Sequence, residues 1–145
     1  MKNKAIIVSG YFNPLHKGHL EYFSMAKSHG AKLIVIVNND YQRKLKGSNE
    51  FMLEDERLLI IQALNITDFV FLSIDKDRTV RKSLEEIYNR YSKSFELFFA
   101  NGGDQDNKTI PEVDICKKLG IKLLDGLGSK IQSSSWLINS KDENK

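Results

Sequence analysis

The sequence predicts an α/β fold in which a five-stranded parallel sheet lies between two layers of helices, a three-layer sandwich. Three observations support this prediction. Short runs rich in β-branched and aromatic residues recur five times along the 145 residues. Segments with helical periodicity follow these runs, and the connecting stretches are short. Alternation of this kind is typical of right-handed parallel crossovers, which place helices on both faces of one sheet.

The first two strands and the helix between them are predicted from two apolar runs. Residues 5–8 form a short apolar run, and residues 19–28 carry a helical pattern that ends before Gly30. A glycine at this place is typical of a helix C-terminus. Residues 32–37 are a continuous β-branched run, which is expected of a strand covered on both faces.

The middle of the chain predicts a loop, two helices and a third strand. Residues 38–50 are polar, with several lysines and a glycine, and are predicted as a loop. Residues 54–65 carry apolar residues at helical spacing, and residues 69–72 form the third apolar run. A second amphipathic stripe over residues 80–91 predicts another helix.

The last third of the chain continues the alternation. Residues 95–100 predict a fourth strand and residues 121–124 a fifth. Between them lies a predicted helix over residues 111–119, with Pro111 in its first turn and Gly120 after its end. A final helix is expected to begin near residue 133 and to extend to residue 139.

The composition is that of a globular protein, with 41% apolar and 28% charged residues. We expect one domain over residues 1–139 and a polar tail over residues 140–145. No apolar run is long enough to cross a membrane and no signal-peptide pattern is present, so we expect a cytoplasmic protein that does not bind membranes. A net charge of +3 is too mild to indicate nucleic-acid binding. The lone cysteine, Cys116, is expected to be a packed thiol.

The residues most suggestive of chemistry lie between the first strand and the first helix. This segment, residues 10–19, reads GYFNPLHKGH and places His16 and His19 at the helix start. Backbone N–H groups at a helix N-terminus favour anions, and imidazoles there can donate hydrogen bonds to phosphate oxygens. A metal site is less favoured, because no third ligand lies nearby in the sequence. The segment therefore indicates phosphate chemistry.

The same segment resembles the HxGH signature of the nucleotidylyltransferase superfamily. Three further segments resemble the superfamily in order and spacing: residues 37–47 (a lysine-bearing loop), 53–57 (LEDER) and 131–138 (IQSSSWLI). The resemblance covers nearly the whole chain and implies a Rossmann-like fold. It includes the glycerol-3-phosphate cytidylyltransferases and the heptose-phosphate and pantetheine-phosphate adenylyltransferases.

The resemblance implies that a substrate phosphate attacks the α-phosphorus of a nucleoside triphosphate and that pyrophosphate leaves, with Mg²⁺ as cofactor. It implies the following roles: catalytic His16, His19 and Lys46; nucleotide-binding Gly10, Tyr11, Phe12, Lys44, Gly102, Asp104, Ser133, Ser134 and Ser135; and acceptor-binding Asn13 and Arg57. No metal-ligating residue of the protein is implied. The family also implies a homodimer.

Several alternatives stay open at this point. The compact length resembles small cytidylyltransferases, and we favour CTP over ATP; the Lys44–Gly47 and Gly102–Asp104 segments resemble the ATP-using heptose-phosphate enzymes. The acceptor is expected to be a small phosphorylated polyol, amino alcohol or sugar. Taken singly, the two lysines could be solvated loop residues, and Arg57 could pair with Glu54 or Asp55. A non-catalytic nucleotide-binding module is the competing function.

Overall fold

The fold is a five-stranded, all-parallel sheet with the strand order β3-β2-β1-β4-β5. A computed structural model describes residues 2–47, 49, 51–100 and 110–124 of the chain. Its strands are β1 (Asn3–Gly10), β2 (Lys32–Val37), β3 (Phe69–Leu72), β4 (Phe95–Ala100) and β5 (Lys122–Leu124). Its helices are α1 (Lys17–Lys27), α2 (Asp40–Lys46), α3 (Glu54–Ala63), α4 (Arg81–Tyr91) and α5 (Val113–Leu119). The predicted fold class is confirmed.

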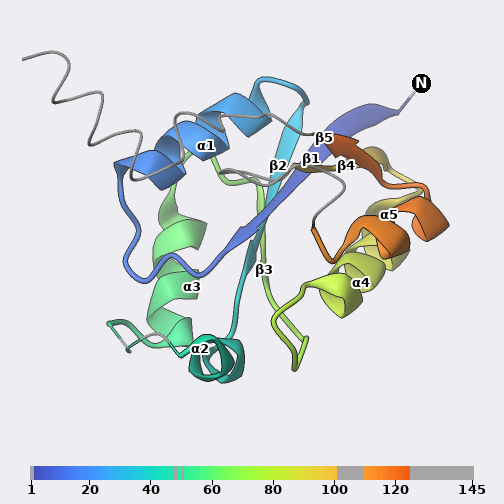
Figure 1. The fold of residues 1–145 in the computed structure, drawn as a ribbon. Coiled ribbons are helices and arrows are strands. Elements are labelled where there is room, and N and C mark those ends of the chain that lie inside the picture. The colour runs from blue at the N-terminus through green and yellow to red at the C-terminus, as the bar shows by residue number, and fades with distance from the viewer. Residues whose placement is uncertain (1, 48, 50, 101–109, 125–145) are drawn as a thin grey trace, which may run out of the picture.

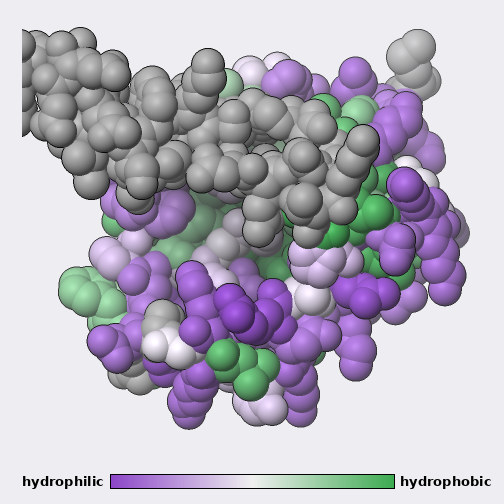
Figure 2. Space-filling model, viewed as in Figure 1, coloured by the Kyte–Doolittle hydropathy of each residue, from purple (hydrophilic) through white to green (hydrophobic). Residues whose placement is uncertain are grey.

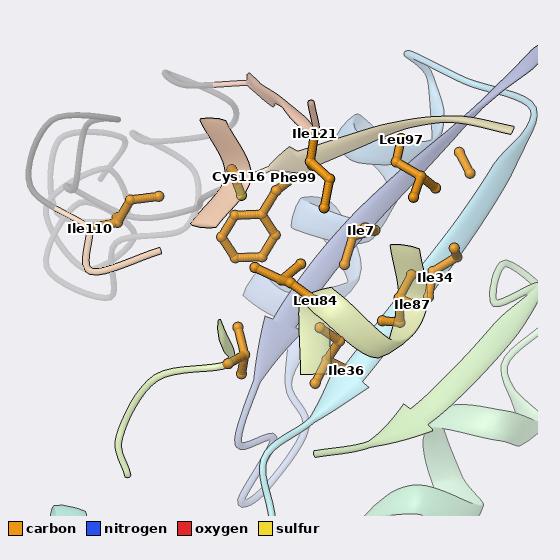
Figure 3. Close-up of a cluster of buried hydrophobic side chains, with 12 residues drawn as sticks. Ile7, Ile34, Ile36, Leu84, Ile87, Leu97, Phe99, Ile110, Cys116 and Ile121 are labelled. Atoms are coloured by element: carbon orange, nitrogen blue, oxygen red, sulfur yellow. The ribbon is translucent and has the colours of Figure 1, made fainter. Parts of the chain in front are cut away.

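Helices cover both faces of the sheet (Figure 1). On one face, α1 and α3 pack over a buried cluster that includes Ile6, Val8 and Phe23. On the other face, α4 and α5 enclose a second cluster around Ile7 and Phe99 (Figure 3). Successive side chains of a strand point to opposite faces, so the apolar run of β1 feeds both clusters in turn. This explains why the central strands are continuously apolar rather than alternating.

Most element boundaries agree with the sequence-based prediction, and β2, β3 and β4 have the predicted limits. The main error is the segment predicted as a loop over residues 38–50, because it contains helix α2. Asn39 caps this helix by accepting from the backbone N–H of Gln42, and the Gln42 side chain accepts from Asn39 N. Gly47 ends it in the left-handed conformation, at φ 83°.

The predicted start of the fifth helix is also wrong. Helix α5 begins at Val113 with Glu112 as its N-cap, so Pro111 lies in the turn before the helix. Gly120 ends this helix as expected, at φ 81°. The helix predicted over residues 133–139 lies outside the described residues. No helix among the described residues is long and apolar enough to cross a membrane.

The topology fixes where a ligand would bind. In parallel sheets of this kind, ligands lie beyond the carboxyl ends of the strands, where the chain order reverses. Here β1 lies at the centre, with β2 on one side and β4 on the other. The segment after β1, helix α2 and the β3–α4 loop therefore meet at one edge of the sheet, the lower edge in Figure 1.

Candidate active site

The two histidines form a reciprocal cap at the N-terminus of α1. The Nδ1 atom of His16 accepts a hydrogen bond from the backbone N–H of Gly18, at 3.1 Å. The Nδ1 atom of His19 accepts from the backbone N–H of His16, also at 3.1 Å. This is the capping-box arrangement, with imidazoles in the places usually taken by serine and glutamate side chains.

This cap assigns a tautomer to both rings. A neutral imidazole has one donor and one acceptor nitrogen. Because Nδ1 is the acceptor in both His16 and His19, each proton lies on Nε2. The ring centroids are 3.9 Å apart, so the two rings lie against each other. The sequence predicts that the backbone N–H groups at this helix start bind an anion. In the structure, those of His16 and Gly18 donate to the imidazoles instead. The Nε2–H groups therefore become the donors for a ligand.

Phe12 packs against His19. It is buried, and its ring meets the His19 imidazole edge-on at 5.0 Å and the Phe23 ring at 5.3 Å. Its backbone has φ 54°, a left-handed conformation that is uncommon outside glycine. A side chain on Gly10 would come within 2.8 Å of the Phe12 ring, so glycine is required there. The structure thus places Phe12 in the core rather than at a ligand surface.

The environment of His19 keeps its imidazole neutral. Burial, together with the neighbouring His16, lowers the pKa of His19 from 6.5 to about 4. Near neutral pH the ring is therefore an uncharged donor through Nε2. A neutral donor can stabilise negative charge on a phosphate oxygen without having to lose a proton during the reaction.

Asn13, expected to bind the acceptor, clamps two loops together. Its amide nitrogen donates to the carbonyl oxygen of Asn49 at 2.8 Å. Its amide oxygen accepts from the backbone N–H groups of Phe51 at 3.0 Å and Met52 at 2.8 Å. The side chain thereby joins the loop before α1 to the connection between α2 and α3. The acceptor-binding role of Asn13 stays a prediction.

Arg57 also joins several segments. Its side chain is 0% exposed. The guanidinium donates to the carbonyl oxygens of Tyr11 and Asn38, each at 2.7 Å, and to that of Met52 at 3.1 Å. It also donates to the Asp40 carboxylate at 2.8 Å. The ion-pair partner is therefore Asp40, not Glu54 or Asp55. The expected acceptor-binding role stays a prediction, and the observed contacts are those of an internal strut.

Asp40 completes this strut as a charged partner. Burial alone would raise its pKa, but a backbone hydrogen bond from Glu54 and the Arg57 guanidinium hold the pKa of Asp40 below its ordinary value. Asp40 and Glu54 also exchange hydrogen bonds, since each carboxylate accepts from the backbone N–H of the other residue. The start of α2 is thus tied to the start of α3.

The two predicted lysines lie on α2, two residues apart, and two residues at that spacing do not share a helix face. Lys46 reaches the site, because its Nζ lies 4.5 Å from the centre of the Tyr11 ring. Lys44 is exposed on the same helix. Arg78 lies near the phenol of Tyr11 and acts on its charge. Burial raises the pKa of the Tyr11 phenol, and Arg78 partly offsets that rise.

A cavity of about 460 Å³ opens at the carboxyl ends of the strands. It is lined from β1, α1, the end of β2, the β3–α4 loop, β4 and the turn before α5: Ser9, Gly10, Tyr11, Tyr22, Asn38, Arg78, Thr79, Val80, Phe99, Ala100, Ile110, Pro111 and Glu112. Gly10 and Tyr11, both predicted to bind the nucleotide, lie on its wall. A larger cavity of about 620 Å³ lies at the opposite end of the sheet and contains none of the predicted site residues.

Several predicted residues cannot be placed. Gly102, Asp104, Ser133, Ser134 and Ser135 lie outside the described residues. Within the described part of the chain, no group of three or more His, Cys, Asp or Glu side chains could hold a metal ion. The expected Mg²⁺ cofactor stays a prediction. Cys116 is buried, and burial raises its pKa to about 12, as expected of a packed thiol.

Sequence reasoning missed Arg78 and Gln42. Arg78 could have been noticed because it follows a strand that ends at the ligand edge. Gln42 is buried, and its amide nitrogen holds the β3–α4 loop. The Asn-x-x-Gln spacing of Asn39 and Gln42 is a capping signal that would have revealed both the helix and this residue.

Comparison with known proteins identifies the relationship at the level of a family. The sequence model described as "Cytidylyltransferase-like" matches residues 7–124, which is most of the chain. Two curated relatives carry the name "Bifunctional protein HldE". The one from Blochmanniella floridana is 37% identical over 84 residues, and the one from Aliarcobacter butzleri is 31% identical over 126 residues.

The matched segments make up a much larger share of this chain than of the relatives. The matched segments are 57% and 85% of this chain but only 17% and 25% of those relatives. The chain therefore spans a quarter or less of the length of the curated relatives it matches. Among solved structures, the lipopolysaccharide core biosynthesis protein from Thermoplasma volcanium has a TM-score of 0.68 at 23% identity. That alignment covers 85% of this chain and 95% of the other, and it supports the fold.

Proposed function

This chain belongs to the cytidylyltransferase-like family, and on that premise we propose that it transfers a nucleoside monophosphate to a small phosphorylated acceptor. An oxygen of the acceptor phosphate attacks the α-phosphorus of a nucleoside triphosphate. The bond from the α-phosphorus to the α,β-bridging oxygen breaks, and pyrophosphate leaves with the bonding electron pair. The step is a displacement at phosphorus and needs no covalent enzyme intermediate.

The observation that carries this proposal is the paired histidine cap. Both Nδ1 atoms are used by the backbone of α1, so both Nε2–H groups are available as donors on adjacent rings. Adjacent donors at a helix N-terminus match the non-bridging oxygens of a transferring phosphoryl group. Lys46 adds a positive charge over Tyr11, in the segment that leads to the histidines, and this charge suits a leaving pyrophosphate.

We propose ATP as the nucleotide and a sugar phosphate as the first acceptor to test. The reason is the resemblance of the Lys44–Gly47 and Gly102–Asp104 segments to ATP-using heptose-phosphate enzymes. The earlier preference for CTP used chain length, and length carries little weight for a chain that spans only part of its relatives. CTP, with a phosphorylated polyol or amino alcohol as acceptor, is the second candidate.

The test is pyrophosphate release in the presence of Mg²⁺. Each of the four ribonucleoside triphosphates is paired with heptose 1-phosphate, glycerol phosphates, phosphoethanolamine, phosphocholine, pantetheine phosphate and nicotinamide mononucleotide. We expect turnover with ATP and one acceptor. Turnover with CTP alone would overturn the choice of nucleotide. Nucleotide binding without turnover for any pair would favour a non-catalytic module.

A matched pair of variants ties the activity to the proposed residues. We expect His19→Ala to abolish pyrophosphate release, since it removes a donor to the transferring group. His29→Ala is the control, because His29 lies after the C-terminal end of α1, at the opposite end of that helix from the cap. Equal turnover of both variants would contradict the assigned role.

A further inference from the structure

The cavity at the ligand edge has a cation that no motif indicates. Arg78 lines it from the β3–α4 loop, and among the described lining residues it is the only lysine, arginine or histidine. Its side chain is exposed, so the guanidinium is accessible to a ligand in solution. Tyr11 lines the same cavity, and the Arg78 guanidinium is close enough to the Tyr11 phenol to lower its pKa.

The backbone on both sides of Arg78 is fixed by hydrogen bonds to Gln42, which is buried, and to the Asp77 carboxylate. The amide nitrogen of Gln42 donates to the carbonyl oxygens of Asp77 at 2.8 Å and Thr79 at 2.7 Å, the two residues that flank Arg78. The carboxylate of Asp77 accepts from the backbone N–H and the hydroxyl of Thr79. The arginine therefore projects from a turn held at both sides, which lowers the entropy lost when its side chain binds an anion.

Further hydrogen bonds anchor the β3–α4 loop before and after this turn. The Asn39 amide donates to the carbonyl oxygens of Ser73 and Asp75, each at 2.9 Å. The backbone N–H of Val80 donates to the Glu112 carboxylate at 3.0 Å. Glu112 is the one carboxylate among the described lining residues, and this contact directs one of its oxygens to the backbone. The cavity thus retains a positive group on a rigid support.

Tyr11 lies between two cations, Lys46 and Arg78. Lys46 lies over its ring, on the side of α2, whereas Arg78 lies near its phenol and lines the cavity. Two separate cations suit a reaction that brings two anions together, because each anion then has its own partner. Arg57 differs from Arg78 in that its side chain is fully buried and its guanidinium donates to Tyr11, Asn38, Met52 and Asp40.

We infer that Arg78 is the residue that recognises the phosphate of the acceptor, and that Gln42 positions it. This inference rests on the proposed function, because it names the acceptor half of the same site. A planar guanidinium can bind two phosphate oxygens at once, which fixes the direction of the attacking oxygen as well as the affinity. Figure 2 shows the face that carries α2 and the β3–α4 loop, and most of its surface is hydrophilic.

The test measures binding and does not require turnover. The protein is first saturated with Mg²⁺ and α,β-methylene-ATP, or α,β-methylene-CTP if only CTP supports turnover, and inorganic phosphate is then titrated by calorimetry. We expect Arg78→Gln to weaken phosphate binding by about tenfold or more, the usual effect of losing a charged hydrogen-bonding partner. Arg78→Lys should retain part of the affinity. Arg81→Gln is the control, since Arg81 is exposed at the start of α4 and does not line this cavity.

The outcomes separate three accounts. If Arg78→Gln loses phosphate and keeps the affinity of the nucleotide analogue within about twofold, the inference holds. If the analogue is lost to the same extent, Arg78 serves the triphosphate and the inference is wrong. It is also wrong if wild type binds no phosphate or if Arg78→Gln binds it equally well. If Arg78→Gln selectively loses phosphate binding but the wild-type protein shows no turnover with any substrate pair, the anion site at Arg78 is supported and the transferase function is rejected.

Discussion

At the scale of single residues, we propose that each of the two histidines performs two tasks with two different nitrogens. The Nδ1 atoms of His16 and His19 accept backbone hydrogen bonds and so begin helix α1. The Nε2 atoms are left to act on the ligand. The histidines are therefore fixed in orientation before any substrate arrives, which is the condition for effective electrostatic stabilisation.

The two tasks can be separated by substitution at His16. Asparagine is among the best N-cap residues and can accept from Gly18 N, but it offers no donor where Nε2 was. We expect His16→Asn to keep stability within about 1 kcal/mol and to lose about 10²-fold or more in turnover. The measurements are urea unfolding and pyrophosphate release.

His16→Gln is the matched variant for this prediction. Glutamine is a poor N-cap but can place an amide donor near the former Nε2 position. It should lose about 1 kcal/mol of stability and retain more turnover than the asparagine variant. If His16→Asn is the more active of the two, the assignment of tasks to the nitrogens is wrong.

The neutral state of His19 predicts a pH dependence of stability. Its pKa is about 4 in the folded protein, below the ordinary 6.5, because of burial and the adjacent His16. The folded state therefore binds fewer protons than the unfolded chain between these values. The free energy of unfolding is therefore highest above pH 6.5 and decreases as the pH falls toward 4, because His19 takes up a proton more readily in the unfolded chain.

Urea unfolding of wild type and His19→Asn at several pH values between 7 and 4.5 tests this prediction. Asparagine can accept the same hydrogen bond from His16 N but does not titrate. We expect the wild-type stability to fall more steeply with decreasing pH than that of the variant. Parallel curves would show that His19 titrates normally in the folded state.

At the scale of elements, the site is held together by side chains that join loops far apart in the sequence. Arg57 on α3 reaches the carbonyl oxygens of Tyr11 and Asn38, 46 and 19 residues away. Gln42 on α2 reaches Asp77 and Thr79, 35 and 37 residues away. Helices α2 and α3 thus act as supports for the loops that carry the histidines and Arg78.

Replacing Arg57 should unfold the protein more readily rather than only weaken ligand binding. Arg57→Met removes the partners of three backbone carbonyls and of the Asp40 carboxylate in a buried setting. We expect a loss of about 3–5 kcal/mol in the free energy of unfolding. Arg90→Met is the control, since Arg90 forms an exposed pair with Glu86 and should cost less than about 1 kcal/mol.

The same experiment distinguishes the observed strut from the acceptor-binding role expected from the sequence. A stable Arg57→Met variant with normal nucleotide binding and weakened acceptor binding would support the expected role. A destabilised variant would support the strut. Urea unfolding together with phosphate titration of the nucleotide-bound protein gives both readouts on one sample.

These contacts also show what a sequence can predict. The strands, and the place of the two histidines at the start of α1, are encoded in contiguous residues, so runs such as 32–37 and the segment 10–19 are sufficient to predict them. The partners of Arg57, Asn13 and Arg78 come together only when the sheet forms. Local spacing contains no information on such backbone partners, and for this reason the expected roles of Arg57 and Asn13 differ from their observed contacts.

At the scale of the whole molecule, the strand order determines where a ligand can bind. With β1 central, the carboxyl ends of β1, β2, β3 and β4 lie at one edge, and the cavity of about 460 Å³ opens there. Two apolar clusters hold the sheet rigid from both faces. In the proposed function, the fold thereby brings two anion-binding regions together, one at the histidine cap and Lys46, the other at Arg78. The expected homodimer stays a prediction.

The central claim is that the acceptor attacks the α-phosphorus of a nucleoside triphosphate. Phosphorus NMR of a reaction with Mg²⁺ and the acceptor that supports turnover tests it directly, because each product has its own signal. The account predicts pyrophosphate together with a pair of coupled doublets from a new asymmetric diphosphate bridge. A nucleoside diphosphate without pyrophosphate would contradict it, whether it forms together with a diphosphorylated acceptor, from attack of the acceptor at the γ-phosphorus, or with orthophosphate, from attack of water there.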